Sequence, residues 1–153
     1  MATQEFNRSL PMMLYRALDA VMPRFRRIFN EFGLTEQQWR VLRVLWEHDD
    51  IAFRDLSETT LIPAPSLVGV VDRLSKQGLV ARKRSETDRR NVFVHATDKG
   101  RELHRVVRPR VDDTYAELRG SVDAEEWRQL MRGLERIASL EQEVPEQRPA
   151  ANQ

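Results

Sequence analysis

The sequence predicts a mainly α-helical fold that carries one small β-hairpin. Apolar residues recur at three- and four-residue steps along most of the 153 residues, which is the spacing of amphipathic helices. Two short runs flank a polar segment and predict a pair of strands. The chain has about the length of one domain, and its 41% hydrophobic and 32% charged residues are ordinary for a protein with a globular core.

A long amphipathic helix is expected over residues 9–32, closed by Gly33, because its apolar side chains share one face. Pro23 lies inside this helix and lacks a backbone N–H, so we expect a kink or a local break there. Thr35 and Gln38 fit a capping box that opens a second helix. The buried face of this second helix is expected to hold Trp39, Leu42, Leu45 and Trp46.

The middle of the chain predicts a helix–turn–helix. Residues 51–53 are expected to form a very short strand, residues 54–60 a two-turn helix and residues 61–65 the turn. The second helix covers residues 65–77 and begins at a proline, whose missing N–H is not needed at that position. Gly78 is expected to stop it in a left-handed cap. The predicted buried stripe is Leu67, Val70, Val71 and Leu74.

A basic hairpin follows the helix–turn–helix. Residues 79–84 and 91–96 predict strands joined by residues 85–90. Five of the nine residues from Arg82 to Arg90 are Arg or Lys, whereas the whole chain has a net charge of only +1. A helix followed by an arginine-tipped ribbon can fill one DNA groove and reach into the next. DNA binding is therefore the first functional hypothesis.

The C-terminal part predicts two more helices. Thr97 is expected to cap a long helix that Pro109 interrupts, and Asp123 is expected to cap the last helix. Residues 143–153 are rich in proline and polar residues, so we expect a disordered tail.

The helices of residues 9–33 and 98–142 flank a central lobe, residues 34–97. Their apolar stripes are wider than a small lobe can cover, so an intertwined homodimer is expected; a monomer with its termini folded back is the alternative. A dimer also suits a palindromic operator, whose half-sites lie one helical turn apart. The predicted fold is mainly α with a small β-wing: a winged helix-turn-helix flanked by N- and C-terminal dimerisation helices.

Several classes of function are not expected. Without cysteine the chain has no disulfide or thiol nucleophile, and His48, His95 and His104 lack metal-ligand spacing, so neither metal nor cofactor is expected. No glycine-rich phosphate loop or nucleophile elbow is present, so we do not expect an enzyme. No apolar run approaches about 20 residues and no secretory signal is visible, so cytoplasmic residence without a membrane partner is expected.

Several motifs carry a family resemblance. They are Leu34-Thr35-Glu36-Gln37-Gln38-Trp39-Arg40-Val41-Leu42, Asp72-Arg73-Leu74 with Gly78-Leu79-Val80, Asp88-Arg89-Arg90, and Thr97-Asp98-Lys99-Gly100. In this order and spacing they resemble the MarR family of winged-helix transcriptional regulators, over roughly residues 10–140. Residues 9–14 together with 34–42 resemble the branch that regulates homoprotocatechuate degradation and represses aromatic-acid catabolism.

The resemblance implies a homodimeric repressor that binds double-stranded DNA at a palindromic operator. Its recognition helix would enter the major groove and its wing the adjacent minor groove, and a small aromatic carboxylate or phenolic effector would release it. The operator sequence, the effector and the choice between repression and activation stay open. The alternatives are a dimeric winged-helix protein-interaction scaffold and a MarR-type regulator of stress or efflux genes.

The recognition helix places Ser66, Val68, Gly69 and Arg73 off its buried stripe, as candidate DNA contacts. Ser66 either bonds a phosphate or base edge or caps the helix. Val68 and the bare backbone of Gly69 suit thymine methyl groups. Arg73 either contacts DNA or forms a salt bridge with Asp72 or with an acid of the wing.

In the wing, the resemblance places Arg90 on the position that inserts into the minor groove, where narrow A·T tracts deepen the negative potential. Asp88 is expected to pair with it and fix its direction. Arg89 is expected to touch phosphate, and Arg82 and Arg84 alternate along the strand so that one face meets the DNA backbone. The alternative is a solvated hairpin tip.

An effector carboxylate needs a cation beside an apolar wall. Helix spacing together with the family fold predicts a pocket lined by Ser9, Met13, Arg16, Trp39 and Arg40. The alternative is that Met13 and Trp39 belong to the core and that Arg16 and Arg40 form salt bridges.

Overall fold

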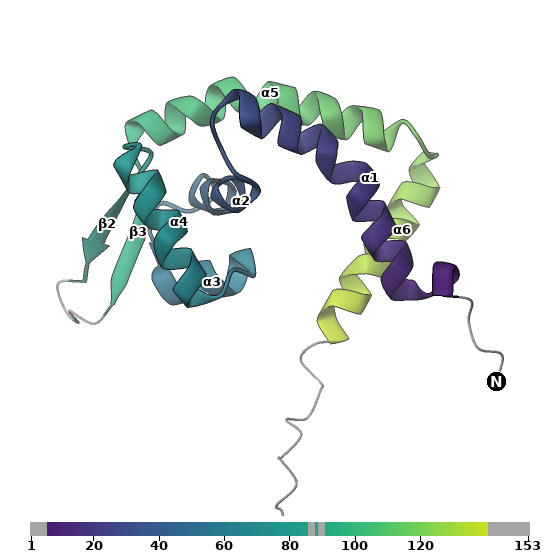
Figure 1. The fold of residues 1–153 in the computed structure, drawn as a ribbon, viewed down its shortest axis with the longest axis horizontal. Helices are drawn as coiled ribbons and strands as arrows, with labels where there is room; N and C mark the ends of the chain where they lie inside the picture. Colours follow the sequence, from purple (N-terminus) through teal and green to yellow (C-terminus); the bar gives the residue numbers. More distant parts are fainter. Residues whose placement is uncertain (1–5, 86–87, 89–90, 141–153) are drawn as a thin grey trace, which may run out of the picture. The chain divides into compact units, whose positions relative to one another are not determined.

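The computed structural model describes residues 6–85, 88 and 91–140. The chain divides into two compact units, of which one ends at Thr114 and the other begins at Tyr115. Helices and a small antiparallel sheet make up these residues, which confirms the predicted mainly α fold with a β-wing (Figure 1). Within them, no helix is both long and apolar enough to cross a membrane.

Two long helices continue through internal prolines. Helix α1 (Leu10–Glu31) follows a single 3-10 turn, η1 (Phe6–Arg8), and is closed by Gly33, whose φ of 66° lies in the left-handed region. It passes Pro23 without a break, and helix α5 (Asp98–Arg119) passes Pro109 in the same way. The local break at Pro23 and the interruption at Pro109 are therefore not observed, while the kink, the other alternative at Pro23, stays a prediction. Both prolines are exposed, so the carbonyl that each deprives of its helical partner can bind water.

Helix α2 (Glu36–Leu45) opens with the predicted capping box. The Gln38 N–H donates to the Thr35 hydroxyl (3.2 Å), and the Thr35 N–H donates to the Gln38 side-chain oxygen (2.8 Å). Leu42 and Leu45 are fully buried, as expected. The capping box therefore fixes the start of α2, and with it the face that enters the core.

Trp39 and Trp46, which were expected on the buried face of α2, are only half-buried. They extend an aromatic column instead: ring centroids lie 4.7 Å apart between Phe29 and Trp39, 5.2 Å between Trp39 and Trp46, and 4.4 Å between Trp46 and His104. The Trp46 indole N–H donates to the Gly100 carbonyl (3.0 Å). The column joins α1, α2 and α5 within the first unit.

The helix–turn–helix consists of α3 (Phe53–Thr60) and α4 (Ala64–Lys76). Phe53, expected in the preceding strand, is the first residue of α3. Leu61 turns the chain with a φ of 53°, and the Ser57 hydroxyl donates to the Ile62 carbonyl (2.7 Å) across the turn. The residues of α4 with no exposed surface are those predicted: Leu67, Val70, Val71 and Leu74.

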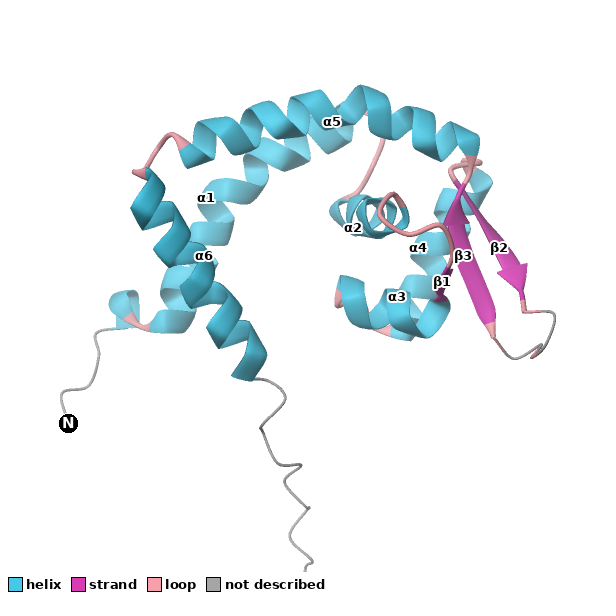
Figure 2. Cartoon of the chain, turned by 180° about the vertical axis from the view of Figure 1, so that it is seen from behind, coloured by secondary structure: helices cyan, strands magenta, loops and turns pink. Residues whose placement is uncertain are grey.

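The wing belongs to a three-stranded antiparallel sheet, counted over the described residues. Strand β3 (Val92–Ala96) lies between β1 (Ile51–Ala52) and β2 (Val80–Arg84), so β2 is an edge strand (Figure 2). The β2–β3 register pairs Val80 with Ala96 and Arg84 with Val92. The wing therefore starts directly after α4 and carries its basic residues away from the core.

The sheet returns to α5 through a tight junction. The Thr97 hydroxyl donates to the Gly78 carbonyl (2.6 Å) and accepts the N–H of Gly100 (3.2 Å), so Thr97 caps α5 as predicted. A Cβ on Gly100 would lie 2.2 Å from the Leu79 carbonyl oxygen. Only glycine fits this approach of α5 to the wing.

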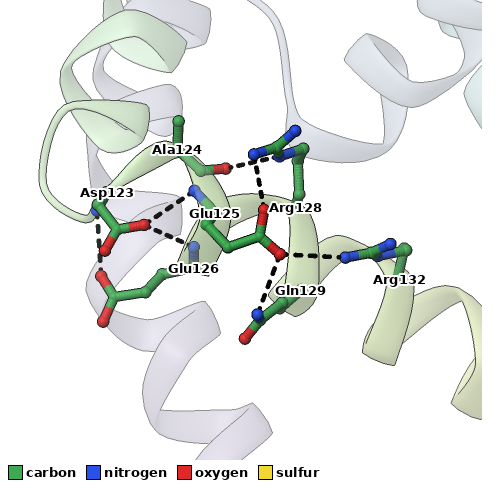
Figure 3. Close-up of polar contacts among 7 residues, drawn as sticks. All are labelled: Asp123, Ala124, Glu125, Glu126, Arg128, Gln129 and Arg132. Atoms are coloured by element: carbon green, nitrogen blue, oxygen red, sulfur yellow. Dashed lines mark hydrogen bonds and ion pairs between the residues drawn. The ribbon is translucent and has the colours of Figure 1, made fainter.

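In the second unit, α6 (Ala124–Ala138) begins at Asp123, whose carboxylate accepts the N–H groups of Glu125 and Glu126 at 2.8 Å (Figure 3). Glu125 in turn accepts from Arg128 at 2.6 Å. No residue of α6 is buried in the single chain. The predicted tail, residues 143–153, lies outside the described residues.

We predict that Gly100→Ala lowers the free energy of unfolding by about 1–3 kcal/mol, because the added methyl group overlaps a backbone carbonyl that cannot move freely. Chemical denaturation at one fixed protein concentration measures the change.

The matched control is Gly69→Ala in α4, where a Cβ would meet only the end of the Arg73 side chain at 3.5 Å. This change is expected to raise stability by up to about 1 kcal/mol through helix propensity. Equal effects of the two substitutions would contradict the close approach at Gly100.

Candidate nucleic-acid interface

The exposed face of α4 carries the predicted recognition residues. Ser66, Val68 and Arg73 are exposed and Gly69 is half-buried, because the buried stripe occupies the opposite face of the helix. Val68 retains 45% of its accessible surface. These four residues therefore lie on the side of α4 that faces away from the core.

The Ser66 hydroxyl makes no hydrogen bond to any residue that the structure describes. Residue Pro63 occupies the N-cap position of α4 without a side-chain cap bond, so capping by Ser66, one of the two alternatives, is not observed. The Ser66 N–H donates to the Pro63 carbonyl (2.9 Å) inside the first turn. Its hydroxyl remains available for an external acceptor.

Arg73 lies back along α4. Its terminal nitrogen is 3.5 Å from the position that a Cβ on Gly69 would take, so the missing side chain of Gly69 leaves room for the guanidinium. Asp72, one of its expected partners, pairs with Arg82 instead (2.7 Å). Over the described part of the chain, Arg73 forms no ion pair, and its charge faces solvent.

The two arginines of β2 differ in their surroundings. Arg82 is held by Asp72, and the same terminal nitrogen makes a longer hydrogen bond of 3.4 Å to the Val68 carbonyl. Arg84 is exposed and has no ion pair with a described residue. The sequence predicted that both arginines contact the DNA backbone, because alternation along a strand places them on the same face. Their different partners depend on where α4 lies beside that strand.

A cavity of about 720 Å³ opens between the recognition helix and the wing. Its wall is largely apolar, and three arginines stand among the lining residues. The lining residues are Ala52, Phe53, Arg54, Ser57, Glu58, Ala64, Val68, Arg82, Arg84, Asn91 and Val92. This hollow has the composition expected of a surface that meets an anionic, partly apolar partner.

At the wing tip, Asp88 is exposed, and its carboxylate accepts the Asn91 side-chain N–H at 3.3 Å. The Asp88 N–H donates to the Ser85 hydroxyl (3.2 Å) and its carbonyl accepts the Asn91 N–H (2.9 Å). Arg89 and Arg90 lie outside the described residues, so the expected pairing of Asp88 with Arg90 stays a prediction.

The predicted effector residues fall into two groups in the single chain. Ser9, Met13 and Arg16 lie at the start of α1, where Met13 is 51% exposed and the Ser9 hydroxyl donates to the Phe6 carbonyl (2.8 Å). Trp39 and Arg40 lie on α2. Within the described residues, no hydrogen bond, ion pair or ring contact joins the two groups.

Arg40 already has partners. Its guanidinium donates to the Thr60 carbonyl (3.0 Å) at the end of α3 and lies 3.6 Å from the Glu36 carboxylate. Trp39 stacks on Phe29 through one face. These contacts give both residues a structural role beside the predicted role in effector binding, which stays a prediction.

Among the described residues, the groups with a shifted pKa lie outside α4 and the wing. Hydrogen bonding from Arg110 lowers the pKa of Glu31, and Arg110 has its own pKa raised by the same contact. Burial, followed by the positive charges of Arg108 and Arg43, lowers the pKa of His104. No group of three or more His, Cys, Asp or Glu residues that could hold a metal ion occurs in the described ranges.

Comparison with known proteins gives matches over most of the chain. The MarR family profile matches residues 32–91. An HTH-type transcriptional regulator, FarR of Neisseria gonorrhoeae, is 38% identical over 75% of this chain and 79% of its own length. The homoprotocatechuate degradative operon repressor of Escherichia coli is 33% identical over 95% of this chain and 98% of its own.

Among solved structures, NadR in complex with 4-hydroxyphenylacetate has a TM-score of 0.77. It is 36% identical in sequence, and the match covers 90% of this chain and 98% of the other. The likeness therefore extends over sequence and fold together.

Arg84→Ala is expected to reduce the steepness of log Kobs against log salt for duplex DNA by about one unit for each bound protomer, since each phosphate contact releases about one counterion. Fluorescence anisotropy at several salt concentrations measures the slope.

Arg105→Ala serves as the control, because Arg105 is equally charged but lies on α5, paired with Glu102 at 3.0 Å. An identical slope for wild type and Arg84→Ala would remove Arg84 from the interface.

Proposed function

The chain belongs to the MarR family of transcriptional regulators, and from this premise we propose that it is a homodimeric repressor of an aromatic-compound catabolic operon. It binds a palindromic operator, and a small aromatic acid or phenol releases it. Members of this family are transcriptional regulators and not enzymes.

One observation carries the DNA-binding part of the proposal: an exposed helix face lies beside an arginine that has no ion pair with any residue that the structure describes. Ser66, Val68 and Arg73 face away from the core on α4, and Arg84 ends the neighbouring strand. A helix of this kind fits the major groove, and a basic ribbon beside it reaches the sugar-phosphate backbone. Most other exposed arginines of the first unit already have carboxylate partners; Arg54, Arg101 and Arg110 are examples.

The composition of the helix face predicts the kind of contact. Ser66 and Arg73 supply the hydrogen-bond donors, while Val68 presents methyl groups to the groove. An apolar side chain in the major groove favours the methyl group of thymine over a hydrogen-bonding edge. The operator is therefore expected to place thymine opposite Val68 in each half-site.

The dimer is supported by apolar surface that the single chain leaves open. Helix α6 has no buried residue in the single chain and exposes Leu130, Met131 and Ile137. Helix α1 exposes Leu10 and Leu18. Contiguous apolar faces of this kind are rare on monomers and typical of subunit interfaces. A two-fold dimer presents two recognition helices to a palindromic site.

The effector class is supported by the relatives. The Escherichia coli relative is named for repressing homoprotocatechuate degradation, and NadR was solved with 4-hydroxyphenylacetate. Both compounds join a phenol to a carboxylate. In this chain, Arg16 and Arg40 offer cations for a carboxylate, Ser9 a hydroxyl, and Trp39 and Met13 an apolar wall.

Arg90→Ala is expected to abolish binding to an operator selected by the purified protein from random duplexes, because the resemblance places Arg90 in the minor groove. A gel-shift titration at matched salt measures the loss, while circular dichroism and size-exclusion chromatography show that fold and dimer are retained. Unchanged affinity would contradict a DNA-contacting wing.

Hydroxyphenylacetates and hydroxybenzoates are expected to raise the melting temperature and to release the operator. Ligand at about 100 times its Kd stabilises a protein by about 2.7 kcal/mol, which a thermal-shift assay detects easily.

Acetate, which has the carboxylate without the ring, is the ligand control. Trp39→Ala is expected to lose the shift. No shift with any phenolic or hydroxybenzoic acid would exclude the aromatic effector while leaving DNA binding untouched.

A further inference from the structure

One ion pair joins the recognition helix to the wing. The Arg82 guanidinium lies 2.7 Å from the Asp72 carboxylate and 3.4 Å from the Val68 carbonyl. Asp72 is on α4 and Arg82 is in the middle of β2, ten residues later. The same guanidinium therefore contacts the helix at the residue that presents the exposed Val68 side chain.

The pair holds strand β2 against helix α4. Strand β2 is an edge strand whose backbone pairs with β3 alone, and a two-stranded hairpin is marginally stable by itself. Arg82 ties the unpaired side of this strand to α4. Arg84, two residues further along the same face, is the last residue of β2 before the tip. Holding Arg82 thus sets where Arg84 lies relative to Val68.

The pair is too exposed to act mainly through stability. The Arg82 and Asp72 side chains retain 37% and 46% of their accessible surface, and ion pairs at such sites contribute little to folding. One terminal nitrogen of the Arg82 guanidinium nevertheless contacts both the Asp72 carboxylate and the Val68 carbonyl, and the planar guanidinium is less flexible than a lysine ammonium, so these contacts restrict where β2 lies beside α4.

We propose that Asp72 and Arg82 form a clamp, named the helix–wing clamp, and that Arg82 positions the wing on the DNA instead of contacting phosphate. The clamp rests on the proposed DNA-binding function. It also explains an acidic residue beside the recognition surface: a lone carboxylate there would repel phosphates, and Arg82 neutralises it.

Asp72→Asn is expected to change DNA affinity in opposite directions for the two possible roles of Arg82, as a clamp or as a phosphate contact. If Arg82 bound phosphate, removal of the nearby negative charge would free Arg82 and tighten DNA binding. The clamp predicts the reverse, with affinity for the selected operator falling roughly tenfold over the two protomers. Fluorescence anisotropy at fixed salt measures the affinity.

Glu102→Gln is the matched control. It removes the same charge from an exposed 3.0 Å ion pair with Arg105 on α5, and we expect operator affinity to change less than about twofold. Thermal unfolding of each variant shows whether the fold is retained.

Variants of Arg82 give a second, independent readout. Arg82→Gln is expected to weaken binding as much as Asp72→Asn, and the double variant no more than either alone, because both break one contact. Arg82→Lys is expected to recover part of the affinity, because a lysine keeps the positive charge opposite Asp72 but holds it on a more flexible side chain. Additive losses in the double variant would overturn the clamp.

The outcomes separate the clamp from the function on which it rests. Operator binding by the wild type, with equal or tighter binding by Asp72→Asn, overturns the clamp and leaves the DNA-binding function standing. A wild-type protein that selects no duplex overturns both. Weaker binding by Asp72→Asn, with Glu102→Gln unchanged and both variants folded, supports the clamp.

Discussion

Burial of one stripe of α4 is the constraint on which the rest of the molecule depends. Leu67, Val70, Val71 and Leu74 have no exposed surface, and each fully buried side chain of this kind contributes about 1.5–3 kcal/mol. A helix with this stripe fixed can present only one other face. Because the stripe cannot rotate without exposing four aliphatic side chains, Val68 must point outward. The recognition surface is therefore a consequence of packing, set before any contact with DNA.

The position of the wing also depends on α4. Gly78 ends α4, and β2 begins two residues later, so the strand returns beside the helix that precedes it. Thr97 then bonds Gly78 and opens α5, while Gly100 lets α5 approach the Leu79 carbonyl. The start of the wing is thus held by backbone contacts, and its middle by the side chains of Asp72 and Arg82.

Whether an arginine of this protein can bind DNA depends on whether it already forms an ion pair with a carboxylate. The chain is nearly neutral, with a net charge of +1, and many of its arginines neutralise a carboxylate within a few ångströms. Exposed ion pairs of this kind contribute little to stability, but an arginine that is paired with a carboxylate is less available to bind DNA phosphates. On the recognition surface, Arg73 and Arg84 have no such partner among the described residues, and Arg84 lines a hollow with a largely apolar wall.

Local patterns in the sequence determined the helices, the caps at Thr35 and Asp123, the buried stripe of α4 and the two strands of the basic hairpin, because spacing and capping act within a few residues. The sequence also supplied the family through its motifs. Tertiary structure alone decided that Arg82 is held by Asp72 whereas Arg84 has no ion pair with a described residue, since alternation gives both arginines the same face and only the neighbouring helix distinguishes them. It also moved Trp39 and Trp46 from the core into an aromatic column and kept α1 and α5 continuous through their prolines. These outcomes depend on which elements become neighbours, and no periodicity within one element contains that information.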